Sequence, residues 1–222
     1  MSIQMSKFVY LCIFWYNICI MENIIRYNRL NEYYKNKFGE RTLKICIDAG
    51  FTCPNRDGTL SNCGCIFCSQ DGSGDLIKYS ALSISNQVQN FLNSYRGLRA
   101  NKFIAYFQNF TNTYDSLENL KEKYDAALVS DKIVGISIAT RPDCITEDIA
   151  KLIASYADKY DVSVELGLQT SNDNIGRIIN RYYTTTQFTT AVNILRKYNI
   201  EIITHMMIGL PKESFVDIKD TV

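Results

Sequence analysis

The sequence has almost no net charge, no low-complexity linker and no internal repeat. A formal charge of +1 neither favours nor excludes a polyanionic partner. Because no linker interrupts it, a chain of 222 residues with 46% hydrophobic content suits one domain, or part of a larger one.

The sequence also lacks an apolar run of comfortable membrane-spanning length. The run from Phe8 to Met21, interrupted only by Asn17, is too short for that role. A secretory signal is disfavoured, because one lysine precedes the run and no small-residue cleavage site follows it. Two other interpretations of the run stay open: a buried or membrane-contacting helix, and a mis-assigned start. The second, with Met21 as the functional beginning, is favoured. Residues 1–20 are therefore interpreted as an apolar extension and residues 21–222 as the functional domain.

The eight cysteines are not spread as in a small disulfide-bonded secreted protein. Four of them, Cys53, Cys63, Cys65 and Cys68, lie within the stretch Phe51 to Gly74, and the others are scattered through apolar segments. This clustering is more typical of a metal site in a reducing compartment. A cytoplasmic protein without stable membrane association is expected.

Strand-like and helix-like segments alternate from Met21 onwards. The pattern predicts a polar-aromatic helix or lid over Arg26–Phe38. It also predicts five strands, at Thr42–Ala49, Lys102–Asn109, Ile133–Arg141, Val162–Thr170 and Glu201–Gly209. Helices are predicted between and after the strands, at Ser83–Leu98, Ser116–Val129, Thr146–Tyr160, as a pair over Asn172–Tyr198, and at Ser214–Val222.

Five strand-then-helix units imply parallel strands joined by right-handed crossovers, and thus an α/β sheet curled into an open or closed barrel. Such folds bind ligands at the carboxyl ends of their strands. Alternation turns Glu165, Gly167 and Gln169 towards the interior and packs Val164, Leu166 and Leu168 under helices. A polar ligand is favoured over buried ion pairs and water as the partner of the interior polar groups. The other strands contribute to this interior face Gly135, Ser137, Ala139, Arg141, Cys46, Asp48, His205, Met207 and Gly209.

The cysteine loop follows the first strand, at the edge where the polar residues converge. Cys65 and Cys68 are spaced to bind one metal centre, with Cys53 as a third ligand. A structural zinc site with Cys63 as fourth ligand is an alternative. A redox pair of Cys65 and Cys68 would leave Cys53 unexplained. A [4Fe-4S] cluster on three thiolates leaves one iron open to a further ligand.

Six motifs in order, GFTCPNRDG, CIFCSQDGSG, YFQNFTNTY, SIATRPDCI, VELGLQTSND and HMMIGLPKES, carry a family resemblance. From about Arg26 to its last residue, the chain resembles the radical S-adenosylmethionine (SAM) superfamily, in particular its YhcC/YtqA-type proteins. These are relatives of the elongator catalytic subunit and oxygen-independent coproporphyrinogen oxidase. The resemblance implies a TIM-barrel-like partial (β/α)6 barrel, of which about five β/α units are present.

The resemblance also implies a [4Fe-4S] cluster on Cys53, Cys65 and Cys68 that, with an electron donor, cleaves SAM reductively to a 5′-deoxyadenosyl radical. Cys63 is then spare, and catalytic side chains are not assigned. The residues that match SAM contacts of the family are Phe67, Asn109, Thr140, Gln169, Arg181, Ile208 and Gly209.

Three departures bear on this match. The second strand has FQN instead of a GGE-type sequence, Ala139 replaces a glutamate of the elongator branch, and YYTTTQ after Arg181 lacks an expected Gly-His. The sequence stops before the sixth strand of the family, which is interpreted as C-terminal truncation. A tRNA wobble uridine is the favoured substrate from the elongator relatives; a small-molecule substrate and a non-catalytic zinc-stabilised binding module are the alternatives.

Overall fold

The computed structural model describes residues 27–70, 72 and 82–222. The apolar extension predicted at residues 1–20 lies outside these ranges, so its role stays a prediction. The chain divides into two compact units, Met1–Gly39 and Glu40–Val222. In the ranges described, no helix combines the length and the apolar character that crossing a membrane requires.

Helix α2, Leu30–Phe38, lies in the described part of the first unit. It is shorter than the predicted Arg26–Phe38, and Arg26 lies outside the described residues. The helix ends at Gly39, whose φ of 79° is left-handed and whose N–H donates to the Lys35 carbonyl oxygen over 2.8 Å. Glycine suits this position because it has no Cβ to strain such a conformation.

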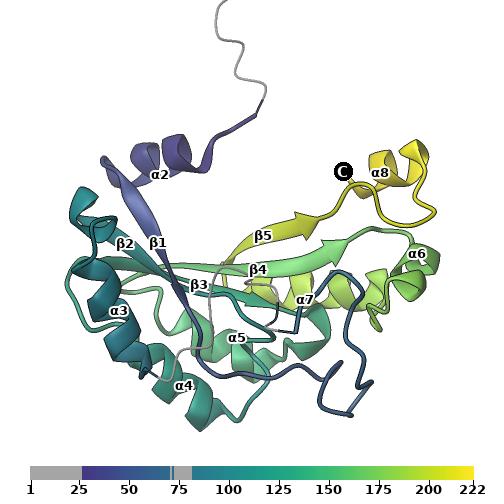
Figure 1. Cartoon of the computed structure of the whole chain (residues 1–222), viewed down its shortest axis with the longest axis horizontal. Coiled ribbons are helices and arrows are strands. Elements are labelled where there is room, and N and C mark those ends of the chain that lie inside the picture. Colours follow the sequence, from purple (N-terminus) through teal and green to yellow (C-terminus); the bar gives the residue numbers. More distant parts are fainter. Residues whose placement is uncertain (1–26, 71, 73–81) are drawn as a thin grey trace, which may run out of the picture. The chain divides into compact units, whose positions relative to one another are not determined.

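The second unit is built on a five-stranded parallel sheet in the order β1-β2-β3-β4-β5 (Figure 1). The strands are β1 Thr42–Ile47, β2 Lys102–Phe107, β3 Ile133–Thr140, β4 Asp161–Gln169 and β5 Glu201–Met206. Each strand pairs with the next one along the chain, as expected for successive β/α units. The α/β fold predicted from the sequence is confirmed.

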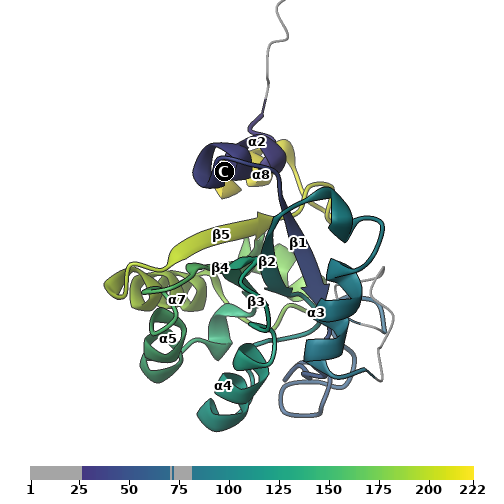
Figure 2. The same cartoon turned by 90° about the vertical axis from the view of Figure 1, so that its left-hand side faces the viewer.

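Helices α3, α4, α5 and α7 lie on the same face of this sheet (Figures 1 and 2). The helices and short 3₁₀ turns of the unit are α3 Ile84–Leu92, η1 Gly97–Arg99, α4 Leu117–Asp125, η2 Pro142–Cys144, α5 Glu147–Ala154, α6 Asp173–Ile178, α7 Thr185–Lys197 and α8 Phe215–Thr221. The predicted cap Thr146 accepts a hydrogen bond from Ile149 N and begins α5.

The core lies between the helices and the sheet. Val164 and Leu166 of β4 are fully buried there with Leu120 of α4 and Ile153 of α5. This is the aliphatic face that alternation predicted for β4, so the opposite face of the strand is left for polar residues.

The predicted end of the fifth strand is wrong. The strand ends at Met206 rather than Gly209. Gly209 has a φ of 87°, and its N–H donates to Glu213 Oε2 over 2.7 Å. Ile208 and Gly209 therefore lie in the turn after β5, where Ile208 is 73% exposed.

Candidate functional site

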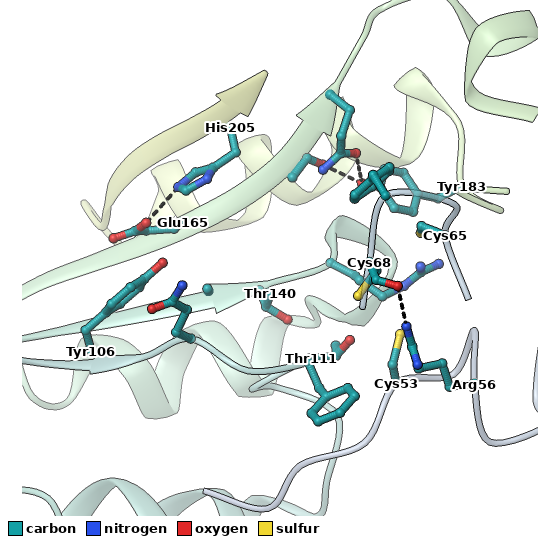
Figure 3. A pocket seen from close by; sticks show the side chains of 17 residues that line it. Cys53, Arg56, Cys65, Cys68, Tyr106, Thr111, Thr140, Glu165, Tyr183 and His205 are labelled. Carbon is teal, nitrogen blue, oxygen red and sulfur yellow. Dashed lines mark hydrogen bonds and ion pairs between the residues drawn. The ribbon is translucent and has the colours of Figure 1, made fainter. Parts of the chain in front are cut away.

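A cavity of about 190 Å³ lies at the carboxyl ends of the strands and is shown in Figure 3. Residues from the loop after β1 and from the other four strands or their following loops contribute to its wall. They are Cys53, Arg56, Cys65, Phe67, Cys68, Tyr106, Gln108, Phe110, Thr111, Ala139, Thr140, Arg141, Glu165, Gly167, Gln169, Tyr183 and His205. Distant segments of the sequence therefore converge on the edge of the sheet where the sequence predicted a site.

Three of the four clustered cysteines line this cavity. Cys53, Cys65 and Cys68 are partly buried free thiols, whereas Cys63 is exposed and lies outside the cavity wall. Burial raises the pKa of the Cys65 thiol, and the positive charge of Arg141 and a hydrogen bond from Asn55 oppose that rise. Arg141 and Asn55 would favour a thiolate at Cys65 in a metal complex, whereas burial opposes it.

The spacing of the thiols bears on the zinc alternative. Within the described ranges, no three Cys, His, Asp or Glu side chains are close enough together to hold one metal ion. A single tetrahedral zinc would draw its sulfur ligands to about 2.3 Å from one centre. In a [4Fe-4S] cluster each cysteine binds a different iron, so its sulfur ligands lie further apart than those of one zinc ion.

Arg56 and Arg141 bring two cations to the cysteine end of the cavity. Arg56 donates to the Cys68 carbonyl oxygen over 2.8 Å and thereby holds the loop. Arg141 forms a bidentate pair with Asp143, at 3.0 and 2.8 Å, and lies 4.8 Å from the centre of the Tyr183 ring. Burial disfavours its charged form, but the bonds and charge of Asp143 raise the Arg141 pKa, so it stays a cation.

Gln169 reaches the cavity through an irregular end of β4. The pairing of β4 with β5 shifts between Gly167 and Gln169, and Gln169 has a left-handed φ of 59°. Its Oε1 accepts a 2.6 Å hydrogen bond from the Tyr183 hydroxyl. A Cβ at Gly167 would lie 2.4 Å from Gln169 Nε2, so the glycine is required for this arrangement.

Phe67 and Thr140 also line the cavity, as the sequence predicted. The Thr140 hydroxyl shares a 2.6 Å hydrogen bond with Thr113. Four other predicted SAM contacts are not part of the wall: Asn109, Arg181, Ile208 and Gly209. Their contacts with SAM stay predictions. Cys46 and Asp48, expected to share the interior polar face, do not line the cavity either.

Arg181 is held inside the protein. The side chain is fully buried, and its guanidinium donates to the carbonyl oxygens of Leu168 and Thr170, each at 2.6 Å. It also donates to the Tyr183 carbonyl oxygen and to Asp173 Oδ1 over 2.7 Å. Most of its donor capacity is thus used by the end of β4 and the segments that follow it, and binding a SAM carboxylate would require some of these bonds to exchange.

At the other end of the cavity Glu165 is the centre of a polar network. The carboxylate is only 3% exposed and is paired with Lys44. It also contacts His205 Nε2 at 2.7 Å and accepts from the Ser137 hydroxyl at 2.7 Å. Burial alone would raise the pKa of Glu165, but the His205 hydrogen bond and Lys44 together lower it to about 2. Within the protein, Glu165 therefore pairs with Lys44, the buried ion pair that the sequence left as the alternative to a ligand.

Several residues of the cavity wall were not among the predicted SAM contacts, including Arg141, Tyr183 and His205. Tyr183 follows the buried Arg181 in a loop without periodicity, so no pattern directed attention to it. Arg141 and His205 were on the predicted interior faces, and that alternation was the available signal. Neither the Arg141 pair with Asp143 nor the His205 contact with Glu165 could be derived from spacing.

Residues 50–222 match the family model described as the Radical SAM superfamily. The uncharacterized protein YtqA of Bacillus subtilis (strain 168) is 41% identical over 189 residues, which cover 85% of this chain and 59% of YtqA. Protein YhcC of Escherichia coli (strain K12) is 34% identical over 178 residues, 80% of this chain and 57% of YhcC. The chain thus spans less than two thirds of the length of these relatives.

A shorter match joins the chain to a tRNA uridine(34) acetyltransferase of Dehalococcoides mccartyi, at 34% identity over 100 residues, 45% of this chain and 20% of that protein. Among solved structures, Elp3 of Methanocaldococcus infernus superposes with a TM-score of 0.55 at 16% identity, covering 81% of this chain and 41% of that one. Coproporphyrinogen III oxidase (HemN) of Escherichia coli gives 0.52 at 17% identity, with 81% and 40% covered. At identities of 16% and 17% the superpositions support the fold alone.

Proposed function

Because the chain belongs to the radical SAM superfamily, we propose that it binds a [4Fe-4S] cluster through Cys53, Cys65 and Cys68 and cleaves SAM reductively. The observation that carries this proposal is the convergence of three free thiols on one cavity at the carboxyl ends of a parallel sheet. The family itself implies the cluster and SAM as cofactors.

The residues present fit such a group. Three thiols without a disulfide are the donor set that a cluster with one open iron needs. The Thr111 hydroxyl also lines the cavity and is buried with no hydrogen-bond partner among the described residues, which leaves it available to a ligand. When bound, the cluster supplies the electron that breaks the bond between the SAM sulfonium and its 5′ carbon and yields a 5′-deoxyadenosyl radical.

The side chains around the thiols are suited to binding and orienting SAM. Arg141 is a buried cation beside the cysteines and favours negative charge on their sulfur atoms. Gln169 presents an amide from the irregular end of β4, and Tyr183, hydrogen-bonded to it, presents a hydroxyl from the segment before α7. Phe67 offers an aromatic face at 37% exposure. Binding on such preorganised groups limits water and holds the reacting atoms in one arrangement.

We assign substrate binding to the end of the cavity opposite the cysteines. Figure 3 shows Tyr106, Glu165 and His205 at that end. Glu165 is fixed by Lys44 and Ser137, whereas the His205 side chain is 50% exposed. The histidine can therefore exchange a hydrogen bond or a proton with a substrate while Glu165 holds its ring in place.

For the substrate we propose a tRNA wobble uridine. Support comes from the partial similarity to a protein named as a tRNA uridine(34) acetyltransferase. Modified nucleosides in tRNA from cells with and without the gene test this proposal. A wobble uridine modification is expected to disappear with the gene, and an unchanged nucleoside profile would exclude tRNA and leave a small molecule.

The cofactor proposal has a separate test that needs no substrate. The chain, purified without oxygen and given SAM and a chemical reductant, is expected to form 5′-deoxyadenosine. The expected protein is brown and contains iron and sulfide. A colourless protein with stoichiometric zinc would instead support the zinc-stabilised binding module.

A further inference from the structure

One side chain outside the cavity wall makes a direct contact with a cysteine of the proposed cluster site. Asn55 is completely buried two residues after Cys53. Its Nδ2 donates to the Cys65 sulfur at 3.4 Å and to the Asn180 carbonyl oxygen at 2.7 Å. Both acceptors require a donor, so the amide orientation with nitrogen towards them is the one that the hydrogen bonds support.

The contact is held in place from both sides of the cysteine loop. The Gly64 N–H donates to the Asn55 carbonyl oxygen over 2.8 Å, so the main chain of Asn55 also holds the residue next to Cys65. On the other side of Cys65, the Ile66 N–H donates to the Ile179 carbonyl oxygen over 3.1 Å. The Asn55 amide is therefore a fixed, completely buried donor to a partly buried sulfur, and a hydrogen bond to an anionic sulfur is strengthened in such surroundings.

We propose that Asn55 raises the reduction potential of the cluster through its hydrogen bond to the Cys65 sulfur. The inference rests on the proposed function, in which Cys65 is a thiolate ligand of iron. Reduction adds one electron, and part of the added negative charge lies on the ligand sulfur atoms. A donor aimed at one sulfur stabilises the reduced state more than the oxidised state, and hydrogen bonds of this kind are a main determinant of cluster potential.

Two substitutions remove the donor while keeping the size of the side chain. Asn55→Leu replaces the amide by an apolar group, and Asn55→Asp replaces it by acceptors. Either is expected to shift the potential in the negative direction, with Asn55→Asp shifting it further because a carboxylate repels the added electron. For Asn55→Leu the expected change is about tenfold in the ratio of oxidised to reduced cluster, which equals about 59 mV for a one-electron couple.

Asn112 provides a matched control. It is also fully buried, and its Nδ2 donates to the carbonyl oxygens of Ala139 at 2.8 Å and Phe107 at 3.2 Å, with no sulfur as partner. Asn112→Leu therefore removes comparable hydrogen bonds to the main chain. It is expected to lower stability to a similar degree and to leave the potential unchanged, which separates tuning of the cluster from a general loosening of the fold.

The experiment is a redox titration of the full chain, reconstituted anaerobically and followed by the electron paramagnetic resonance signal of the reduced cluster. A negative shift in either loaded Asn55 variant, without a shift in Asn112→Leu, supports the inference. Equal potentials in the wild type and a loaded Asn55 variant, or an equal shift in Asn112→Leu, would overturn it and leave the proposed function intact. A wild-type chain that acquires no cluster would overturn the proposed function and this inference together.

Discussion

Replacing Glu165 with glutamine tests the polar network at the substrate end of the cavity. The substitution keeps the size of the side chain and one acceptor oxygen but removes the charge. Lys44, whose side chain is only 17% exposed, and His205 then lose their anionic partner. Ser137, which is linked to Ser163 over 2.9 Å, then donates to a neutral amide oxygen instead of a carboxylate.

The size of the effect follows from the pKa of Glu165. Its value of about 2 lies below the ordinary 4.5, so the folded state binds this proton less readily than the unfolded state. The ionised carboxylate therefore contributes stability above pH 4.5, and that contribution is lost as the pH falls from about 4.5 to about 2. The full contribution is about 3 kcal/mol, of which about 2 kcal/mol is lost by pH 3.

Urea unfolding of the wild type and of Glu165→Gln between pH 7 and pH 3 measures this contribution. The variant is expected to be less stable at pH 7, and the difference is expected to shrink as the pH falls. Asp148→Asn is the control, because Asp148 and its partner Lys151 are 68% and 59% exposed and such pairs contribute little. If the free energies of unfolding of the wild type and Glu165→Gln change in parallel with pH over this range, ionised Glu165 does not make the stabilising contribution given above.

Three further predictions concern the same cavity. Ionised Glu165 can only accept hydrogen bonds, so His205 in its neutral form should carry its proton on Nε2. His205 is the single histidine of the chain, and nitrogen-15 spectra that place the proton on Nδ1 would contradict this. Gly167→Ala should displace the Gln169 side chain, since the added Cβ would lie 2.4 Å from Gln169 Nε2, and should weaken SAM binding measured by calorimetry. Undiminished affinity would show that Gln169 is not a SAM contact. Arg181→Ala should lower the free energy of unfolding by about 2–4 kcal/mol, because buried carbonyl oxygens lose their donor. The same variant should bind SAM more weakly, and a folded variant with wild-type affinity would show that Arg181 is not a SAM contact.

Hydrophobic alternation was enough to predict the layers of this fold. A period of two in β4 separates the buried Val164 and Leu166 from Glu165 and Gln169, and the structure has the same division. The end of β5 could not be predicted in this way. Apolar residues continue from Met206 to Ile208, so the pattern persists where the backbone has already turned towards Gly209.

The cavity was predicted in part for similar reasons. Strand ends and the clustered cysteines bring Cys53, Cys65 and Cys68 to one edge of the sheet, and their position was predicted. The hydrogen bonds of Arg181 and Asn55 depend on carbonyl groups of distant loops, and no sequence spacing encodes such contacts. The bulge that aims Gln169 at the cavity likewise depends on a left-handed φ, which is rare for a residue other than glycine.

Replacing single cysteines tests directly whether Cys53, Cys65 and Cys68, and not Cys63, hold the cluster. Wild type, Cys63→Ser and Cys65→Ser chains would be reconstituted without oxygen and compared for iron, sulfide and formation of 5′-deoxyadenosine from SAM. Because the Cys63 side chain is exposed and outside the cavity, Cys63→Ser is expected to match the wild type, whereas Cys65→Ser is expected to lose both the cluster and the product. Loss of iron in Cys63→Ser, or full retention in Cys65→Ser, would contradict it.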